Sequence, residues 1–198
     1  MFLTRMALDI TRPDTLALLA SAADLRLAVL STFAGGNLQP LFRLDDYGSR
    51  KWLVILSRLR PTMIALHQRY GYLGVFPSWE TFPEDDMMEQ ATDGTEWYYE
   101  LSASPGAGSG AELWQESRWG EWVAALGREA GFVPLTCSLK KVWLADMDGP
   151  QLPVARLRGS LRVTNQTSFD WSVASGLGEG RPFGAGLMTI SRSRSVWD

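Results

Sequence analysis

The chain has 198 residues, of which 45% are hydrophobic, so it is long enough to bury a core and to form one or two small domains. Its net charge of -3 argues against a general nucleic-acid binder. No apolar stretch approaches the length of a membrane span, and Asp9 and Arg12 interrupt the first one too early for a signal peptide. Cys137 is the only cysteine, which excludes an internal disulfide and favours a reducing, cytoplasmic compartment.

The first hundred residues predict the order β-α-β-β-α-β, which is that of a ferredoxin-like fold. The pattern of apolar residues indicates four strands, at 2–9, 40–44, 51–57 and 96–103. Ser21 and Asp24 form a capping box that opens a helix through residue 30, and residues 11–20 are expected to add a turn or half-helix before it. Pro61 suits the start of a second helix, and Gly71 suits its end.

The second half begins after a stretch rich in glycine, serine and proline. Residues 104–111 are expected to form a linker or a surface loop, which gives one domain at 1–103 and another at 112–198. Beyond it the sequence predicts a helix that ends at Gly131, strands at 135–145 and 154–164, a short helix at 168–175 and a final strand after Gly186. We interpret this order as a second, altered ferredoxin-like half, although the chain contains no internal sequence repeat.

Acidic and basic residues are unevenly distributed along the chain. Residues 79–122 hold eleven acids and one base, whereas residues 134–198 hold eight bases and five acids. Any contact with RNA is therefore expected to come mainly from the C-terminal part, with the acidic middle facing solvent or a protein partner. Trp119 and Trp122 stand at helical spacing, which favours core packing or a protein interface over base stacking.

Residues 176–187 form a glycine loop that reads G-L-G-E-G-R-P-F-G-A-G-L. Such a segment bends tightly, exposes backbone N–H groups and lets another backbone approach closely, so it is suited to holding an anion. The candidate anion-binding residues within it are Gly178, Gly180 and Arg181. Arg181 stands where a dinucleotide fingerprint needs its third glycine, and no G-K-[ST] follows as in a Walker loop.

This loop resembles the glycine-rich signature of RAMP-type CRISPR RNA-processing proteins. It is most similar to the CasE (Cse3) family of the type I-E Cascade complex, whose chains end in G-[IV]-G-x-x-K-x-x-G-x-G-L-L, with Arg181 here at the lysine position. The opening M-F-L-T-R-M-A-L, the L-A-S at 19–21 and the W-Y-Y-E-L-S-A-S-P at 97–105 extend the resemblance over nearly the whole chain. The resemblance implies an α+β fold of tandem ferredoxin-like (RAMP) halves with antiparallel sheets.

The resemblance also implies a function, namely recognition and processing of CRISPR RNA. The implied partners are the CRISPR RNA repeat stem-loop and other Cascade subunits, and no membrane, metal or small-molecule cofactor is expected. In the family a ribose 2′-OH attacks the adjacent phosphate, and a basic hairpin of the C-terminal domain binds the repeat stem. The corresponding cations of this chain are Lys140, Lys141, Arg156, Arg158 and Arg162.

The chain departs from the family at positions that matter for chemistry. Arg26 stands where the family has its catalytic histidine, and arginine stays protonated near neutral pH, so its role is electrostatic at most. Glu100, Ser102 and Ser104 stand in the segment where family members carry R-x-R-A-N-P. His67, the only histidine, is expected to be a surface or partly packed helix residue. Two alternatives therefore remain, a non-catalytic cap on the 3′ hairpin and a RAMP-fold protein-interaction subunit.

Overall fold

The computed structural model describes residues 1–35, 38–47, 50–74, 78–106, 116–145 and 152–193. The chain forms two compact units. Unit 1 comprises Met1–Asp85 together with Pro182–Gly184, and unit 2 comprises Asp86–Arg181 together with the residues from Ala185 onward. Each unit is described by itself.

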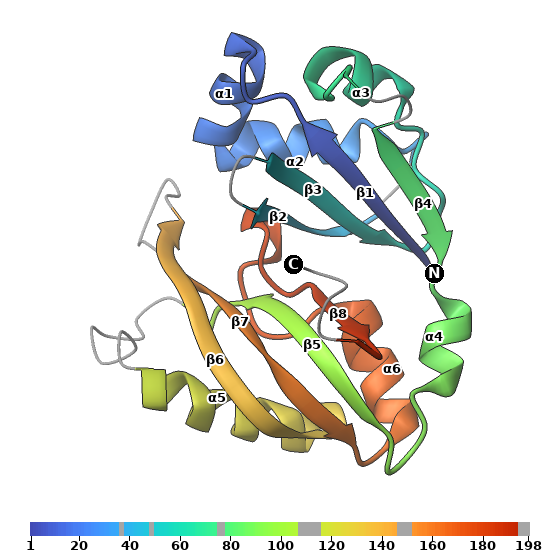
Figure 1. Ribbon diagram of the computed structural model, residues 1–198, viewed down its shortest axis with the longest axis vertical. Helices are drawn as coiled ribbons and strands as arrows, with labels where there is room; N and C mark the ends of the chain where they lie inside the picture. The colour runs from blue at the N-terminus through green and yellow to red at the C-terminus, as the bar shows by residue number, and fades with distance from the viewer. Residues whose placement is uncertain (36–37, 48–49, 75–77, 107–115, 146–151, 194–198) are drawn as a thin grey trace. The chain divides into compact units, whose positions relative to one another are not determined.

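Unit 1 contains a four-stranded antiparallel sheet with helices on one face (Figure 1). Its elements are β1 (Phe2–Leu8), α1 (Pro13–Ala20), α2 (Ala22–Leu30), β2 (Leu41–Tyr47), β3 (Arg50–Ser57), α3 (Ile64–Tyr70) and β4 (Trp79–Pro83). The strand order is β2-β3-β1-β4, which is the ferredoxin-like arrangement that the sequence predicts.

Local signals in the sequence explain the helices of unit 1. The Ser21 side chain accepts a hydrogen bond of 3.1 Å from the backbone N–H of Asp24, which confirms the predicted cap of α2. The amide of Gly71 closes α3 on the carbonyl of His67, as predicted, although α3 begins at Ile64 and not at Pro61. The alternate residues Met6 and Leu8 of β1 belong to the core that these helices cover.

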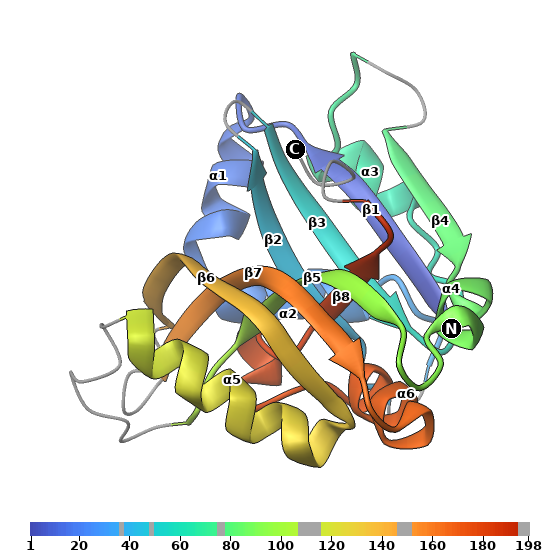
Figure 2. The same cartoon turned by 60° about the horizontal axis from the view of Figure 1, so that its bottom comes forward.

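Unit 2 repeats the same order of elements. It contains β5 (Glu96–Ala103), α5 (Glu116–Ala130), β6 (Phe132–Ala145), β7 (Leu152–Val163), α6 (Gln166–Ser175) and β8 (Met188–Ser191). A 3-10 turn, η2 (Arg181–Phe183), precedes β8 in the chain, and its last two residues belong to unit 1. The antiparallel sheet of unit 2 has the order β6-β7-β5-β8, with α5 and α6 on one face (Figure 2). Both halves are therefore ferredoxin-like, which confirms the predicted tandem α+β fold.

Packing in unit 2 follows the alternation of its strands. Leu157 and Leu161 of β7 are fully buried on the face that the helices cover. On the same face, the ring of Phe132 packs edge-on against that of Phe169 in α6, with 6.0 Å between the ring centroids. Trp119 of α5 is fully buried and contacts Trp122, so it is a core residue and not part of an exposed protein interface.

The predicted boundary between the domains is wrong. Residues 96–103 form a strand, as predicted, but β5 pairs with β7 and β8 and therefore belongs to unit 2. The fourth strand of sheet 1 is β4, whose Trp79 and Thr81 pair with Met6 and Thr4 of β1. The sequence did not reveal β4 because it has only five residues and ends in a proline. Unit 1 ends near Asp85, where the short helix α4 (Asp85–Gln90) begins.

The predicted linker at 104–111 needs the same correction where it is described. Ser104 is fully buried, and its carbonyl accepts a hydrogen bond of 2.8 Å from the amide of Glu179. This bridge places residues 104–106 within unit 2, beside the glycine loop. Residues 107–111 lie outside the described part of the chain.

Candidate nucleic-acid interface

The predicted cations of β7 lie on one face of sheet 2. Side chains alternate along a strand, so Arg156, Arg158 and Arg162 point away from the helices, opposite to the buried Leu157 and Leu161. We call this side of the sheet the polar face. From β5 it receives the cross-strand partners of the three arginines, which are Ser102, Glu100 and Glu96.

The predicted lysines of β6 reach the polar face through a β-bulge. Lys141 stands directly opposite Arg156, and the register shifts between Leu139 and Lys141, so Lys140 is the inserted residue. Both lysines are exposed. In the described part of the chain, neither side chain has a hydrogen bond or ion pair with another residue. The bulge therefore adds a second cation at this point of the hairpin.

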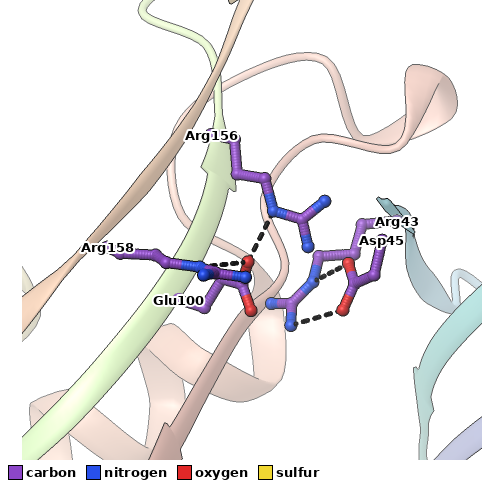
Figure 3. A network of polar contacts seen from close by, with 5 residues as sticks. All are labelled: Arg43, Asp45, Glu100, Arg156 and Arg158. Atoms are coloured by element: carbon purple, nitrogen blue, oxygen red, sulfur yellow. Dashed lines mark hydrogen bonds and ion pairs between the residues drawn. The ribbon is translucent and has the colours of Figure 1, made fainter. Parts of the chain in front are cut away.

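Three ion pairs connect the arginines of β7 to the glutamates of β5. Oε1 of Glu100 accepts from Nε of Arg156 at 2.5 Å and from Nε of Arg158 at 2.9 Å, as Figure 3 shows. Arg162 pairs with Glu96 at 2.6 Å, but both of those side chains are about half exposed. Of the three arginines, Arg156 is buried, Arg158 is partly exposed and Arg162 is exposed.

Unit 1 has a buried ion pair of its own. Nε of Arg43 lies 2.7 Å from Oδ1 of Asp45, and its Nη2 donates to Oδ2 at 3.2 Å (Figure 3). The two residues lie two apart on β2, so their side chains share a face of that strand. The bidentate geometry is the strong form of an arginine–carboxylate pair.

The glycine loop has the backbone that its sequence predicts. All five of its glycines have positive φ, and α6 ends at the first of them, Gly176. At Gly178, φ is +76°, and a Cβ atom would stand 2.6 Å from the carbonyl oxygen of Ser104. At Gly180, where φ is +80°, a Cβ would collide with the side chain of Leu152. Close approach of other parts of unit 2 therefore requires glycine at both positions.

Several backbone N–H groups of the loop, which the sequence suggests could bind an anion, donate hydrogen bonds within unit 2. The amides of Leu177 and Glu179 donate to the carbonyls of Gly186 and Ser104, and the amide of Gly186 donates to Ser102 of β5. The first of these hydrogen bonds closes the loop on itself, and the other two attach it to the C-terminal end of β5 and the residue that follows it. The exposed Arg181 side chain donates from Nη2 to the carbonyl of Gly176 at 3.2 Å, so it stays close to the loop.

Arg26 lies in unit 1, on an exposed turn of α2. Among the described residues it forms no hydrogen bond or ion pair. The ordered helix, capped at Ser21, therefore holds a solvated guanidinium at the position where the family resemblance places a histidine.

His67 has a different environment from the expected one. It is 2% exposed, and its ring packs against Trp79 with 4.6 Å between the centroids. Burial lowers the pKa of His67 from its ordinary value, because the charged form loses water. The only histidine of the chain is thus a core residue of unit 1.

In the described ranges no three His, Cys, Asp or Glu side chains gather closely enough to hold a metal ion. No helix of the described chain is long and apolar enough to cross a membrane.

Comparison with known proteins identifies the family. The model of a family described as CRISPR associated protein matches residues 1–192. The chain belongs to this family. A search of curated protein sequences finds no match.

Solved structures of CRISPR-associated proteins share the fold. Thermus thermophilus Cse3 bound to an RNA representing a pre-cleavage complex is 18% identical, with a TM-score of 0.78 over 96% of this chain and 98% of that chain. Cas6e from Escherichia coli str. K-12 is 14% identical, with a TM-score of 0.64 over 96% and 99%. A chain of a CRISPR RNA-guided surveillance complex is 17% identical, with a TM-score of 0.61 over 96% and 99%. At these identities the likeness establishes the fold.

Sequence reasoning missed the role of Glu100. It noted this residue only as a missing cation, whereas the structure makes it the common partner of Arg156 and Arg158. One signal was available, because Glu96 and Glu100 lie on the same face of a strand, as Arg158 and Arg162 do. This signal was incomplete, because the sequence of neither strand specifies the register in which β5 pairs with β7.

Proposed function

We propose that this chain binds the stem-loop of CRISPR repeat RNA as a CasE-like subunit of a Cascade-type complex. Membership of the CRISPR-associated family and the fold shared with RNA-bound Cse3 support the proposal. The assembly would bring the chain into contact with other Cascade subunits in the cytoplasm. We assign the RNA contact chiefly to unit 2.

One observation carries this assignment. Cations from two adjacent strands stand on the polar face, with the exposed Lys140 and Lys141 from β6 and the partly exposed Arg158 and exposed Arg162 from β7. Double-stranded RNA is recognised largely through its shape and its phosphates, which a rigid row of cations on a sheet can match. The glycine loop, which precedes the last strand of unit 2, adds Arg181. Arg156 is buried against Glu100 and contributes less directly.

Cleavage is a separate matter from binding. Attack by a 2′-OH needs one group that accepts a proton and another that donates one. The guanidinium of Arg26 stays charged and does neither, although it can hold a phosphate and stabilise its developing negative charge. We therefore propose that the chain holds the repeat hairpin and cleaves it slowly or not at all, which makes it a cap on the CRISPR RNA.

Binding and cleavage can be tested in the same mixture. The purified chain is titrated against a labelled RNA of CRISPR repeat sequence and against an unstructured RNA of equal length, in EDTA. We expect a gel shift for the hairpin, stronger than for the unstructured RNA, with no cyclic-phosphate product over the time of binding. Absence of a gel shift at micromolar protein and low salt would refute the proposal that the chain binds the hairpin. Rapid EDTA-resistant cleavage would refute the proposal that it acts as a cap that cleaves slowly or not at all.

The chain offers a matched control for the RNA face. Arg128 is exposed and basic like Lys141, and both belong to unit 2. Arg128 stands on α5, which covers the opposite face of the sheet. Lys141→Ala should weaken hairpin binding, whereas Arg128→Ala should leave it unchanged. Equal losses of hairpin affinity in the two variants would show that an exposed cation contributes to binding whichever face of the sheet it lies on.

A further inference from the structure

Tyr98 places an aromatic ring on the polar face of sheet 2. It lies on β5 between Trp97 and Tyr99, whose side chains are buried on the face that the helices cover, so that of Tyr98 points the other way. The residue is 38% exposed. Among the residues that the structure describes, its side chain has no hydrogen bond, ion pair or ring contact. The ring is therefore accessible to a ligand.

The cross-strand neighbours of Tyr98 are small hydroxyl residues. Ser160 of β7 and Ser191 of β8 stand directly opposite it, and Thr136 of β6 stands opposite Ser160. Two of these hydroxyls, those of Thr136 and Ser160, share a hydrogen bond of 2.9 Å, and the third donates to the carbonyl of Ser193 at 2.7 Å. The tyrosine ring thus belongs to a row of otherwise short polar side chains across the four strands.

A cation lies within reach of this ring. Arg162 is two residues beyond Ser160 on β7, so it is a diagonal neighbour of Tyr98 on the same face, at a separation that long side chains span. Its ion pair with Glu96 joins two side chains that are about half exposed, and such pairs are weak. An RNA phosphate can therefore compete with Glu96 for the guanidinium of Arg162.

The place of the ring in the sheet suits base stacking. β5 is an inner strand of the order β6-β7-β5-β8, and α5 and α6 cover the other face (Figure 2). In RNA-recognition motifs, aromatic side chains on a four-stranded sheet stack bases in this way. Proteins that bind single strands combine such stacking with cations that hold the backbone. A base inside a continuous double helix is stacked on both sides, so only an unpaired base can use the ring.

We propose that Tyr98 stacks the base of an unpaired nucleotide of the repeat RNA, while Arg162 contacts an adjoining phosphate. The proposal rests on the proposed RNA binding and deepens it, because it adds a site for single-stranded RNA to a face assigned to the phosphates of a stem. Stacking tolerates any base, so this site recognises that a nucleotide is unpaired and not which nucleotide it is.

The test removes the ring without removing a charge. Tyr98→Thr keeps a side chain that favours strands, and a thermal melt checks the fold. We expect its affinity for the repeat hairpin with unpaired flanks to fall roughly tenfold, as for loss of one stacked base. Affinity for a blunt, fully paired RNA of the same stem sequence should stay unchanged. The salt dependence of hairpin binding should also stay unchanged, because no counterion contact is lost.

Two variants supply the controls. Tyr98→Phe retains the ring and should bind the hairpin as the native chain does. Trp171 of α6 is 69% exposed, and α6 lies on the opposite face of the sheet, so Trp171→Ala should leave hairpin affinity unchanged.

An abasic scan identifies the stacked nucleotide. Each unpaired position of the hairpin RNA is replaced in turn by an abasic nucleotide, which keeps the phosphate and removes the base. One position should weaken binding to the native chain about as much as Tyr98→Thr does. In the Tyr98→Thr variant the same abasic position should cause no further loss, because ring and base act as a pair. A purely structural role for Tyr98 would not produce this non-additivity.

The results separate this inference from the proposed function. The inference is overturned if Tyr98→Thr binds the hairpin as the native chain does, or if the paired RNA loses as much affinity as the hairpin. It is also overturned if every abasic position costs the variant as much as it costs the native chain. In each case the native chain still binds the hairpin, so the proposed function stands. If the native chain does not bind the hairpin, both fail.

Discussion

Replacing Gly178 with alanine should destabilise unit 2 by roughly 2 to 4 kcal/mol. Its φ of +76° lies in the left-handed region, which costs an L-residue about 1 to 2 kcal/mol. The new Cβ would also stand 2.6 Å from the carbonyl oxygen of Ser104, so backbone must shift on one side of the contact. That shift would strain the hydrogen bond of 2.8 Å between Glu179 and Ser104, which is worth about 1 kcal/mol.

Urea unfolding measures the loss, and two other glycines of unit 2 calibrate it. Gly94 has a φ of +86° with nothing near its missing Cβ, so Gly94→Ala should cost only the conformational part, about 1 to 2 kcal/mol. Gly120 lies within α5 and faces open space, so Gly120→Ala should stabilise the chain by roughly 0.5 to 1 kcal/mol. If Gly178→Ala costs no more than Gly94→Ala, the loop does not approach Ser104 as described.

Three further predictions concern unit 1. Because burial lowers the pKa of His67, the unfolded chain takes up a proton first as the pH falls below about 6.5, so stability should decline from pH 7.5 to 5.5. Urea unfolding at the two values checks this, and His67→Gln should remove the dependence that the histidine causes. Ser21→Ala should cost about 1 kcal/mol in the same assay, because the amide of Asp24 loses its acceptor; an unchanged midpoint would contradict the cap. Arg26→His should introduce or speed EDTA-resistant cleavage of the hairpin, visible as a cyclic-phosphate product, whereas a variant as slow as the native chain would show that more than this residue is missing.

Much of the fold could be predicted because its signals are local. Strand alternation, the cap at Ser21 and the glycines at 71 and 131 specify elements within a few residues of themselves. Membership of a sheet is not local. The alternation of β5 is the same whichever neighbour it pairs with, so a strand count that missed β4 assigned β5 to the wrong half.

The candidate site shows the same difference between local signals and non-local pairing. The alternation of side chains along β7 was enough to place three arginines on one face, and the family resemblance predicted that they contact RNA. Their partners depend on cross-strand register, which no single segment contains, so the anchoring of Arg156 and Arg158 by Glu100 emerged only from the structure. Similarly, the burial of His67 depends on Trp79, a residue of the strand that the sequence did not reveal.

The salt dependence of hairpin binding tests the central claim, that the polar face of unit 2 holds RNA phosphates. The logarithm of the association constant should fall linearly with the logarithm of salt concentration. Lys141→Ala should make that slope shallower by roughly 0.7 to 0.9, which is the release of about one counterion, while Arg128→Ala on the opposite face leaves it unchanged. A slope that Lys141→Ala leaves unaltered, or that Arg128→Ala reduces equally, would contradict the claim.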